Sequence, residues 1–281
     1  MKNQLTRTIV ICLVSYLGYI LFSNLSSYIA FKLLSPNTDV YCLATIVGLF
    51  RLLFLLCLLF IIKKTSVLTN KGNGFFGGLV SGGYTIFSVI AASILILFTD
   101  YLETGIYNFK LPEKFYFGPT QIYLILAITI SAGICEELLF RGIILNTLRD
   151  YLGRDTFRGT VLAIVISSIA FGTLHLTNIF AGVSLFAAVL QSITAFAIGI
   201  YFGAIYCRWG NIKIVMLLHT LTDLASLLCI SMRTNSDFSS SVNNISGNYS
   251  QLITAAIYTC IGIFLMRKKV RNQMFTYSIS Y

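Results

Sequence analysis

The chain has 281 residues, of which 57% are hydrophobic and only 11% are charged, and its formal net charge is +10. A mean hydropathy of +0.83 excludes an ordinary soluble domain and indicates a polytopic membrane protein. The basic residues flank apolar segments, so the anionic inner leaflet of a lipid bilayer explains the positive charge, and we expect no nucleic-acid partner.

Eight apolar runs follow one another along the chain, and most approach the ~20 residues that a helix needs to cross a bilayer. They cover residues 8–33, 41–62, 75–99, 120–145, 159–178, 182–206, 212–231 and 251–266. Only three prolines and no Gly/Ser-rich linker interrupt them, which favours one integral-membrane domain over residues 1–281. The fold is therefore expected to be all-α, with about eight transmembrane helices.

Several segments lie between or within these runs. The first run is interrupted by a polar stretch at residues 23–27, but it is too long for a signal peptide, so no cleavable signal is expected. A short interfacial helix is expected in the segment between the third and fourth runs. The Ser/Asn-rich residues 234–250 are expected to form a flexible loop. The seven cysteines are scattered along the chain without clustering, which favours buried apolar residues over a disulfide framework or a zinc-finger site.

The distribution of Lys and Arg predicts the topology, because cytoplasmic segments of membrane proteins are enriched in both. With a cytoplasmic N-terminus, fifteen of these residues fall inside and four outside. The inside set is Lys2, Arg7, Lys63, Lys64, Lys71, Arg141, Arg149, Arg154, Arg158, Arg208, Lys213, Arg267, Lys268, Lys269 and Arg271, and the outside set is Lys32, Lys110, Lys114 and Arg233. Both termini are thus expected in the cytoplasm. The Ile/Asn/Lys/Tyr/Phe-rich composition favours an AT-rich bacterial genome, and hence a bacterial plasma membrane.

A few ionisable residues lie inside the apolar runs, where burying charge is expensive and a functional site is the default interpretation. Glu136, Glu137 and Arg141 lie toward the end of the run 120–145. The only two histidines of the chain, His175 and His219, lie in other runs. Asp223 follows His219 by four residues and Phe171 precedes His175 by four. Residues four apart share a helix face.

These spacings predict local pairs. Glu137 is expected to pair with Arg141, which leaves Glu136 free to act as a base toward water. Phe171 is expected to pack against His175.

The same residues could also hold a metal ion. The sequence lacks an HExxH motif, but His175, His219 and Asp223, with Glu136 as a further candidate, form a ligand set consistent with Zn²⁺. A water-activating site without metal fits the same residues. We expect the metal-assisted form, because two imidazoles and Asp223 make a three-ligand set that leaves one coordination position open for water.

The order Glu-Glu-x-x-x-Arg, Phe-x-x-x-His and His-x-x-x-Asp resembles the CAAX-protease and bacteriocin-processing family, also called the Abi or CPBP family of intramembrane proteases. The resemblance covers residues 120–230 and implies that this region is the catalytic core. It also implies a helical bundle enclosing a polar catalytic cavity, and endoproteolysis of a peptide or of a membrane-associated protein near its terminus. The catalytic residues implied are Glu136, Glu137, Arg141, His175, His219 and Asp223. Both metal-dependent and glutamate-dependent hydrolysis are consistent with the family.

Two other functions use the same residues. A non-catalytic membrane regulator or bacteriocin self-immunity protein would bind a peptide, a membrane sensor or a transporter in the same cavity. An ion transporter would need a polar path across the bilayer, whereas the polar residues here cluster in one patch. Arg51 lies inside the second run, and the sequence does not distinguish pairing with an acid, snorkelling or contact with a substrate carboxylate.

Overall fold

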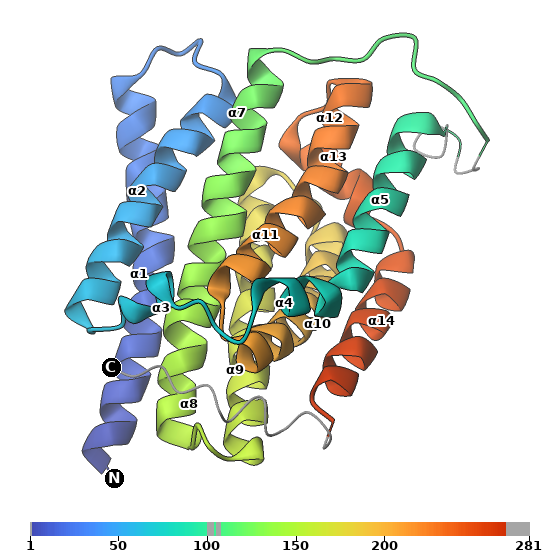
Figure 1. Ribbon diagram of the computed structural model, residues 1–281. Coiled ribbons are helices and arrows are strands. Elements are labelled where there is room, and N and C mark those ends of the chain that lie inside the picture. Colours follow the sequence, from blue (N-terminus) through green and yellow to red (C-terminus); the bar gives the residue numbers. More distant parts are fainter. Residues whose placement is uncertain (1, 100–103, 105–107, 268–281) are drawn as a thin grey trace.

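A computed structural model describes residues 2–99, 104 and 108–267 of the chain (Figure 1). Within these ranges the protein is a helical bundle whose only strand-like pairing is an isolated bridge between Thr99 and Phe109. The all-α prediction is therefore confirmed for the described residues.

Among the described residues, six helical segments are long and apolar enough to cross a membrane. The first two are α1 (Lys2–Leu33) and α2 (Val40–Ile61). The third, Pro119–Leu152, is continuous through α7 (Pro119–Ala127), η1 (Ile128–Glu136), η2 (Leu138–Leu145) and α8 (Asn146–Leu152). The others are α9 (Phe157–His175) with η3 (Leu176–Ala181), α10 (Leu185–Trp209), and Ile212–Thr234, which comprises α11 (Ile212–Asp223), η4 (Leu224–Leu228) and α12 (Cys229–Thr234).

Two further spans are bent helix pairs, which brings the described part of the chain to eight spans if each pair is counted as one. α4 (Phe75–Ser81) and α5 (Gly83–Phe98) meet at 60°, and α13 (Phe238–Ser246) and α14 (Ser250–Leu265) meet at 76°. Gly82 separates α4 from α5, and adjacent glycines are a common cause of a sharp helix bend. The absence of a side chain at Gly82 also permits close packing, because a Cβ there would lie 2.5 Å from Leu218 of α11.

Three local expectations from the sequence have different outcomes. The polar stretch at residues 23–27 does not break α1, because Ser26 donates its hydroxyl proton to the Phe22 carbonyl, 2.6 Å away, within the helix. The flexible loop expected at 234–250 is wrong, because this segment contains α13, whose first turn is capped by Asp237. The interfacial helix expected between the third and fourth spans is absent from residues 108–118, and of residues 100–107 only residue 104 is described.

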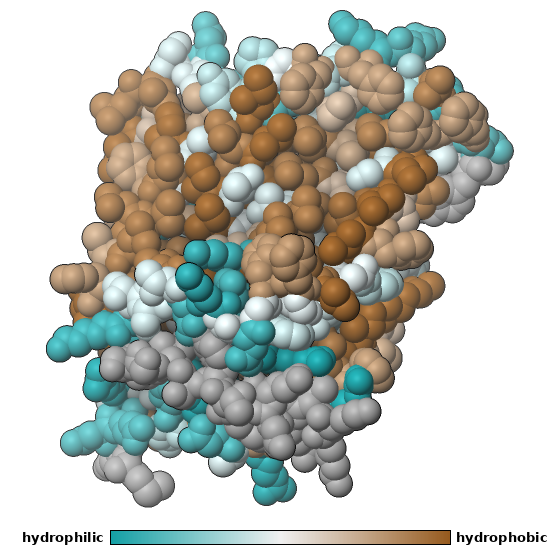
Figure 2. All heavy atoms as spheres, viewed as in Figure 1, coloured by the Kyte–Doolittle hydropathy of each residue, from teal (hydrophilic) through white to brown (hydrophobic). Residues whose placement is uncertain are grey.

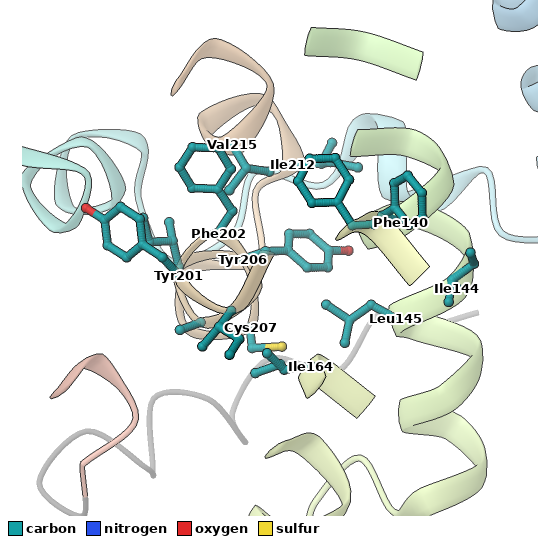
Figure 3. Close-up of a cluster of buried hydrophobic side chains, with 14 of the residues drawn as sticks. Phe140, Ile144, Leu145, Ile164, Tyr201, Phe202, Tyr206, Cys207, Ile212 and Val215 are labelled. Carbon is teal, nitrogen blue, oxygen red and sulfur yellow. The ribbon is translucent and has the colours of Figure 1, made fainter. Parts of the chain in front are cut away.

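The apolar core lies around α10, which packs closely on α9. More than half of the apolar window of α10 is buried in the protein, whereas less than a quarter is buried in α1 and α2. Glycines permit this contact, since a Cβ at Gly172 of α9 would lie 2.7 Å from the Ser192 carbonyl oxygen. Figure 3 shows the neighbouring part of the core, in which Phe140, Phe202 and Tyr206 pack together.

α2 runs parallel to the helix that begins at Pro119, and hydrogen bonds fix their relative register. Thr120 donates to Asp39 at 2.6 Å and Thr45 donates to the Tyr123 carbonyl at 3.1 Å. Further along, the Cys135 thiol lies 3.6 Å from the Gly48 carbonyl oxygen. The middle of α2 is therefore held beside the end of η1.

Lys64, just after the end of α2, joins this end of the helix to α8. The short helix α3 (Ser66–Thr69) follows Lys64 in the chain. The Lys64 ammonium group donates to Asp150 at 2.8 Å and to Thr147 at 3.0 Å. Burial lowers the pKa of Lys64 from its ordinary value, and the bond to Asp150 opposes that effect.

The surface agrees with insertion in a bilayer. Figure 2 shows a broad apolar band over the helices, with hydrophilic side chains gathered toward the two ends of the bundle. α1 begins and α14 ends at the same end of the molecule, as an even number of spans requires (Figure 1). α8 and the start of α9 extend past the level at which α2 ends (Figure 1).

Candidate functional site

The candidate site lies midway along the helix Pro119–Leu152, where wide π-helical turns replace α-helical ones. Glu136 ends η1, Glu137 separates η1 from η2, and Arg141 lies within η2. A third π-helical segment, η4, begins directly after Asp223. Such turns are rare and occur frequently at functional sites, because they change which side chains face a neighbouring helix.

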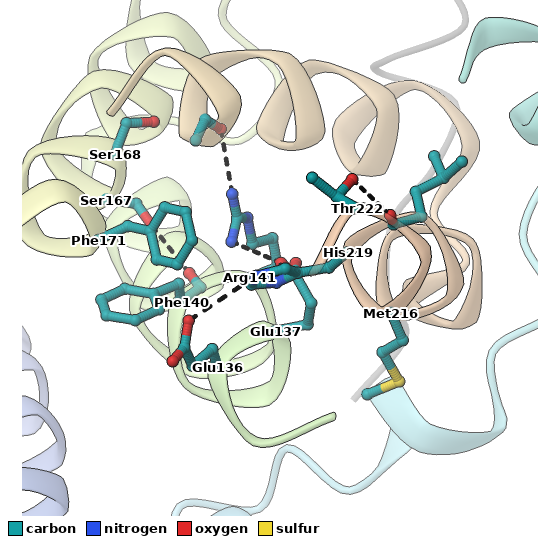
Figure 4. A network of polar contacts seen from close by, with 12 residues as sticks. Glu136, Glu137, Phe140, Arg141, Ser167, Ser168, Phe171, Met216, His219 and Thr222 are labelled. Carbon is teal, nitrogen blue, oxygen red and sulfur yellow. Dashed lines mark hydrogen bonds and ion pairs between the residues drawn. The ribbon is translucent and has the colours of Figure 1, made fainter. Parts of the chain in front are cut away.

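Glu137 is the centre of a fully buried polar network. Its Oε1 atom accepts a bond from the Arg141 guanidinium at 2.8 Å and lies 2.9 Å from Nδ1 of His219 (Figure 4). Glu137 and Arg141 are 0% and 1% exposed, so this pair is removed from water and depends on these partners. The ion pair predicted from the four-residue spacing is confirmed.

Two aromatic rings and a backbone carbonyl complete the surroundings of Arg141. Its guanidinium carbon lies 4.7 Å from the centre of the Phe171 ring and 5.8 Å from that of Phe202. A second nitrogen approaches the Gly199 carbonyl oxygen at 3.4 Å. Cation–π contact and hydrogen bonding thus compensate the desolvation of the arginine.

His219 connects this network to the other acids. Because Nδ1 is engaged by Glu137, the ring is oriented with Nε2 toward Glu136 and Asp223. The Nε2 atom is 3.9 Å from Oε2 of Glu136 and 3.7 Å from Oδ2 of Asp223. The hydrogen bond that orients the ring comes from Glu137, on another helix, and not from Asp223, four residues along the same helix.

Glu136 is the acid that the network leaves without a strong partner. Its Oε2 atom is buried and makes no hydrogen bond to any described residue. The side chain as a whole is 15% exposed and that of Asp223 is 30% exposed, so the site is accessible from their side rather than from the Glu137 side. A carboxylate without a hydrogen-bond donor beside an oriented imidazole has the geometry of a general base.

His175 joins the site through an aromatic neighbour. The edge of its ring meets Phe171 with centres 4.9 Å apart, which confirms the predicted packing, and Phe171 also contacts the His219 ring at 5.6 Å. The Nδ1 atom of His175 lies 3.0 Å from the Phe171 carbonyl oxygen. Since a carbonyl only accepts, Nδ1 carries the proton, and Nε2 is the ring atom available to a ligand.

The proposed zinc ligands do not form a three-residue cluster. Among the residues that the structure describes, no three His, Cys, Asp or Glu side chains are grouped so that they could hold a metal ion. One nitrogen of each histidine is engaged by Glu137 or a backbone carbonyl, and hydrogen bonds of this kind are usual for histidines that bind a metal through the other nitrogen. Zinc binding stays a prediction.

Sequence reasoning identified the acids and histidines but missed the groups that come from α10. Phe202 lies against Arg141 and 6.1 Å from the His219 ring, and Gly199 supplies a carbonyl. An aromatic residue or a glycine in an apolar run carries no local signal for such a role, because both are common in packed membrane helices.

Comparison with known families finds a match over the part of the chain that contains the candidate site. Residues 118–225 match the family model described as type II CAAX prenyl endopeptidase Rce1-like. The match spans the segment from the first turn of α7 to η4 and includes all six candidate site residues. The comparison with curated proteins returned no match. The family match confirms the resemblance over this region, and the candidate membrane spans of the described residues fit a multi-pass membrane protein.

Proposed function

We propose that this chain, whose residues 118–225 form an Rce1-like domain, is an intramembrane endopeptidase that cleaves a peptide or membrane-associated protein with water activated by Glu136. The observation that carries the proposal is the unpartnered Oε2 atom of Glu136, 3.9 Å from the Nε2 atom of an imidazole that Glu137 holds in place. The basic cytoplasmic segments support a location in a plasma membrane with an anionic inner leaflet.

Glu136 serves as the proton carrier in this reaction. It accepts a proton from water as the water oxygen attacks the peptide carbonyl carbon, and the carbonyl oxygen becomes an oxyanion. The protonated Glu136 then gives its proton to the amide nitrogen, and the C–N bond breaks. The products are a new carboxyl terminus and a new amino terminus, so the reaction consumes one water molecule.

The histidines surround the reacting atoms. When both nitrogens of His219 carry protons, Nδ1–H donates to Glu137 and Nε2–H points toward the space between Glu136 and Asp223, where it stabilises an oxyanion. His175 contributes its Nε2 atom to the same site. Glu137 and Arg141 are positioning residues, because Glu137 contacts His219 and Arg141 contacts Glu137, away from the exposed side of the site.

The direct test is reconstitution of the purified protein in liposomes with a pool of random-sequence peptides, read out by mass spectrometry. We expect new peptide termini with the wild type and none with Glu136→Gln, which keeps the shape of the side chain but removes the base. Glu113→Gln, at an exposed acid outside the spans, is the matched control and should cleave normally. Peptide binding by the wild type without cleavage would favour the regulator or immunity protein instead.

A further inference from the structure

Arg51 is a cation in the middle of a membrane helix with no acid bound to it. It lies near the midpoint of α2 (Val40–Ile61), about 16 Å along the helix from either end. Among the described residues it makes no ion pair, although an uncompensated charge at this depth is costly and usually functional. Its distance from both helix ends also separates it from lipid headgroups.

The side chain is held in place by neutral groups of α1. Nε and Nη2 of Arg51 both donate to the Ser23 hydroxyl, and the guanidinium lies 5.4 Å from the centre of the Tyr19 ring. These bonds use one edge of the planar group. The other edge, formed by Nη1 and Nη2, retains donors in the geometry that binds a carboxylate through two parallel hydrogen bonds.

Arg51 lies on the stretch of α2 that passes beside the candidate active site. The contact between Cys135 and the Gly48 carbonyl places Glu136 next to α2, and Arg51 follows Gly48 by three residues on the same helix face. A Cβ at Gly48 would lie 2.6 Å from Ser131 of η1, so the two backbones approach closely here. Arg51 also interacts electrostatically with Glu136.

Unsatisfied polar atoms cluster around the same point. The Tyr19 hydroxyl, the Ser131 hydroxyl and Oε2 of Glu136 are buried and make no hydrogen bond to a described residue. Tyr19 itself is 3% exposed. Buried polar groups are nearly always satisfied, so several of them beside an unpaired arginine point to a polar ligand that enters this space.

We propose that Arg51, with Ser23 and Tyr19, forms a subsite that binds a carboxylate of the peptide substrate next to the bond that Glu136 hydrolyses. This inference rests on the proposed endopeptidase function. The carboxylate has two sources in a peptide, the C-terminus and the side chains of Asp and Glu, and both present the same planar pair of oxygens. Arg51 is thus a specificity-determining residue, whereas Glu136 performs the chemistry.

Binding can be measured separately from cleavage in the Glu136→Gln background. Random-sequence peptide pools would end in either a free carboxylate or an amide, and each kind would be made with and without Asp and Glu. The binding of each pool to the reconstituted protein would then be compared. We expect at least tenfold tighter binding of one carboxylate form, and the arm that shows it identifies the source. Arg51→Gln should abolish the difference, and Arg51→Lys should retain part of it.

Two controls separate this subsite from a structural role and from failure of the protease hypothesis. Arg7→Gln removes an exposed charge near the start of α1 and should leave the preference intact. Ser23→Ala should weaken the preference while thermal unfolding stays unchanged. The subsite would be overturned if all peptide pools bound equally or if none bound. It would also be overturned if Arg51→Gln lost binding of every pool and thermal stability as well. Carboxylate-selective binding by a protein whose wild type cleaves nothing would retain the subsite and reject the endopeptidase.

Discussion

Glu137 holds the candidate site together, because one of its oxygen atoms contacts both Arg141 and His219. Glu136, its neighbour in the sequence, is left without a hydrogen bond. In the proposed mechanism the two adjacent carboxylates have separate tasks, one fixing the imidazole and the other accepting a proton. This division depends on the different partners of the two side chains rather than on any difference in their chemistry.

Removing either member of the buried pair should destabilise the protein. Glu137→Ala leaves Arg141 as an uncompensated buried charge, and Arg141→Ala leaves Glu137, so each change should cost ~3–5 kcal/mol. Thermal unfolding in detergent measures the effect. Glu136→Gln is the matched comparison and should unfold close to the wild-type temperature, since it breaks no hydrogen bond. A similar loss of stability in all three variants would reject separate roles for the two acids.

The metal prediction is tested at the same residues. Because no three His, Cys, Asp or Glu side chains among the described residues are grouped so that they could hold a metal ion, we expect proteolysis to continue after treatment with a chelator. Elemental analysis of the active protein should find zinc well below one equivalent. Loss of activity on chelation, restoration by zinc, and loss of bound zinc in His175→Ala or His219→Ala would instead establish a metalloprotease.

At the level of helices, the site depends on close contact between α9 and α10. Gly199 of α10 faces Ser168 of α9 and also presents its carbonyl oxygen to Arg141. The absence of a side chain at this position lets the two backbones approach, which is the usual role of small residues in membrane helices. Packing and the polar network are therefore coupled at one residue.

Adding a single methyl group at Gly199 should separate these helices. A Cβ there would lie 2.8 Å from the Ser168 Cβ atom, so Gly199→Ala should cost ~1–3 kcal/mol and reduce activity. Gly83→Ala is the matched control, because a Cβ at Gly83 has no atom within 4 Å, and it should leave unfolding unchanged. Equal melting temperatures for both variants would show that this contact does not limit stability.

The sequence predicted the helices better than the contacts between them. Long apolar runs and the spacing of Glu137 and Arg141 depend on local periodicity, which one sequence displays. The Glu137–His219 contact, the π-helical turns and the position of Arg51 beside Glu136 depend on how distant helices pack. The helix α13 was missed because its Ser/Asn-rich composition resembles a loop, whereas the Asp237 cap and the burial of Val242 stabilise it.

For the whole molecule, the distribution of basic residues predicts an orientation in the membrane with both termini in the cytoplasm. Cysteines introduced into a cysteine-free background at Lys63 and Asp155 should react with an impermeant reagent only from the cytoplasmic side, and one at Ser240 only from outside. All three positions are exposed. Labelling of residue 155 from outside would reverse the proposed topology and place the opening of the site on the other face.

The bundle brings Glu136, the proposed base, close to the His219 imidazole that Glu137 orients. The most direct test of its proposed activity is the transfer of oxygen from water to a product. Wild-type protein in H₂¹⁸O should release a peptide fragment with ¹⁸O in its new carboxyl group, detected by mass spectrometry. Glu136→Gln, equally folded, should yield no labelled product above background. Unchanged formation of labelled product by Glu136→Gln would contradict the assignment of Glu136 as the base.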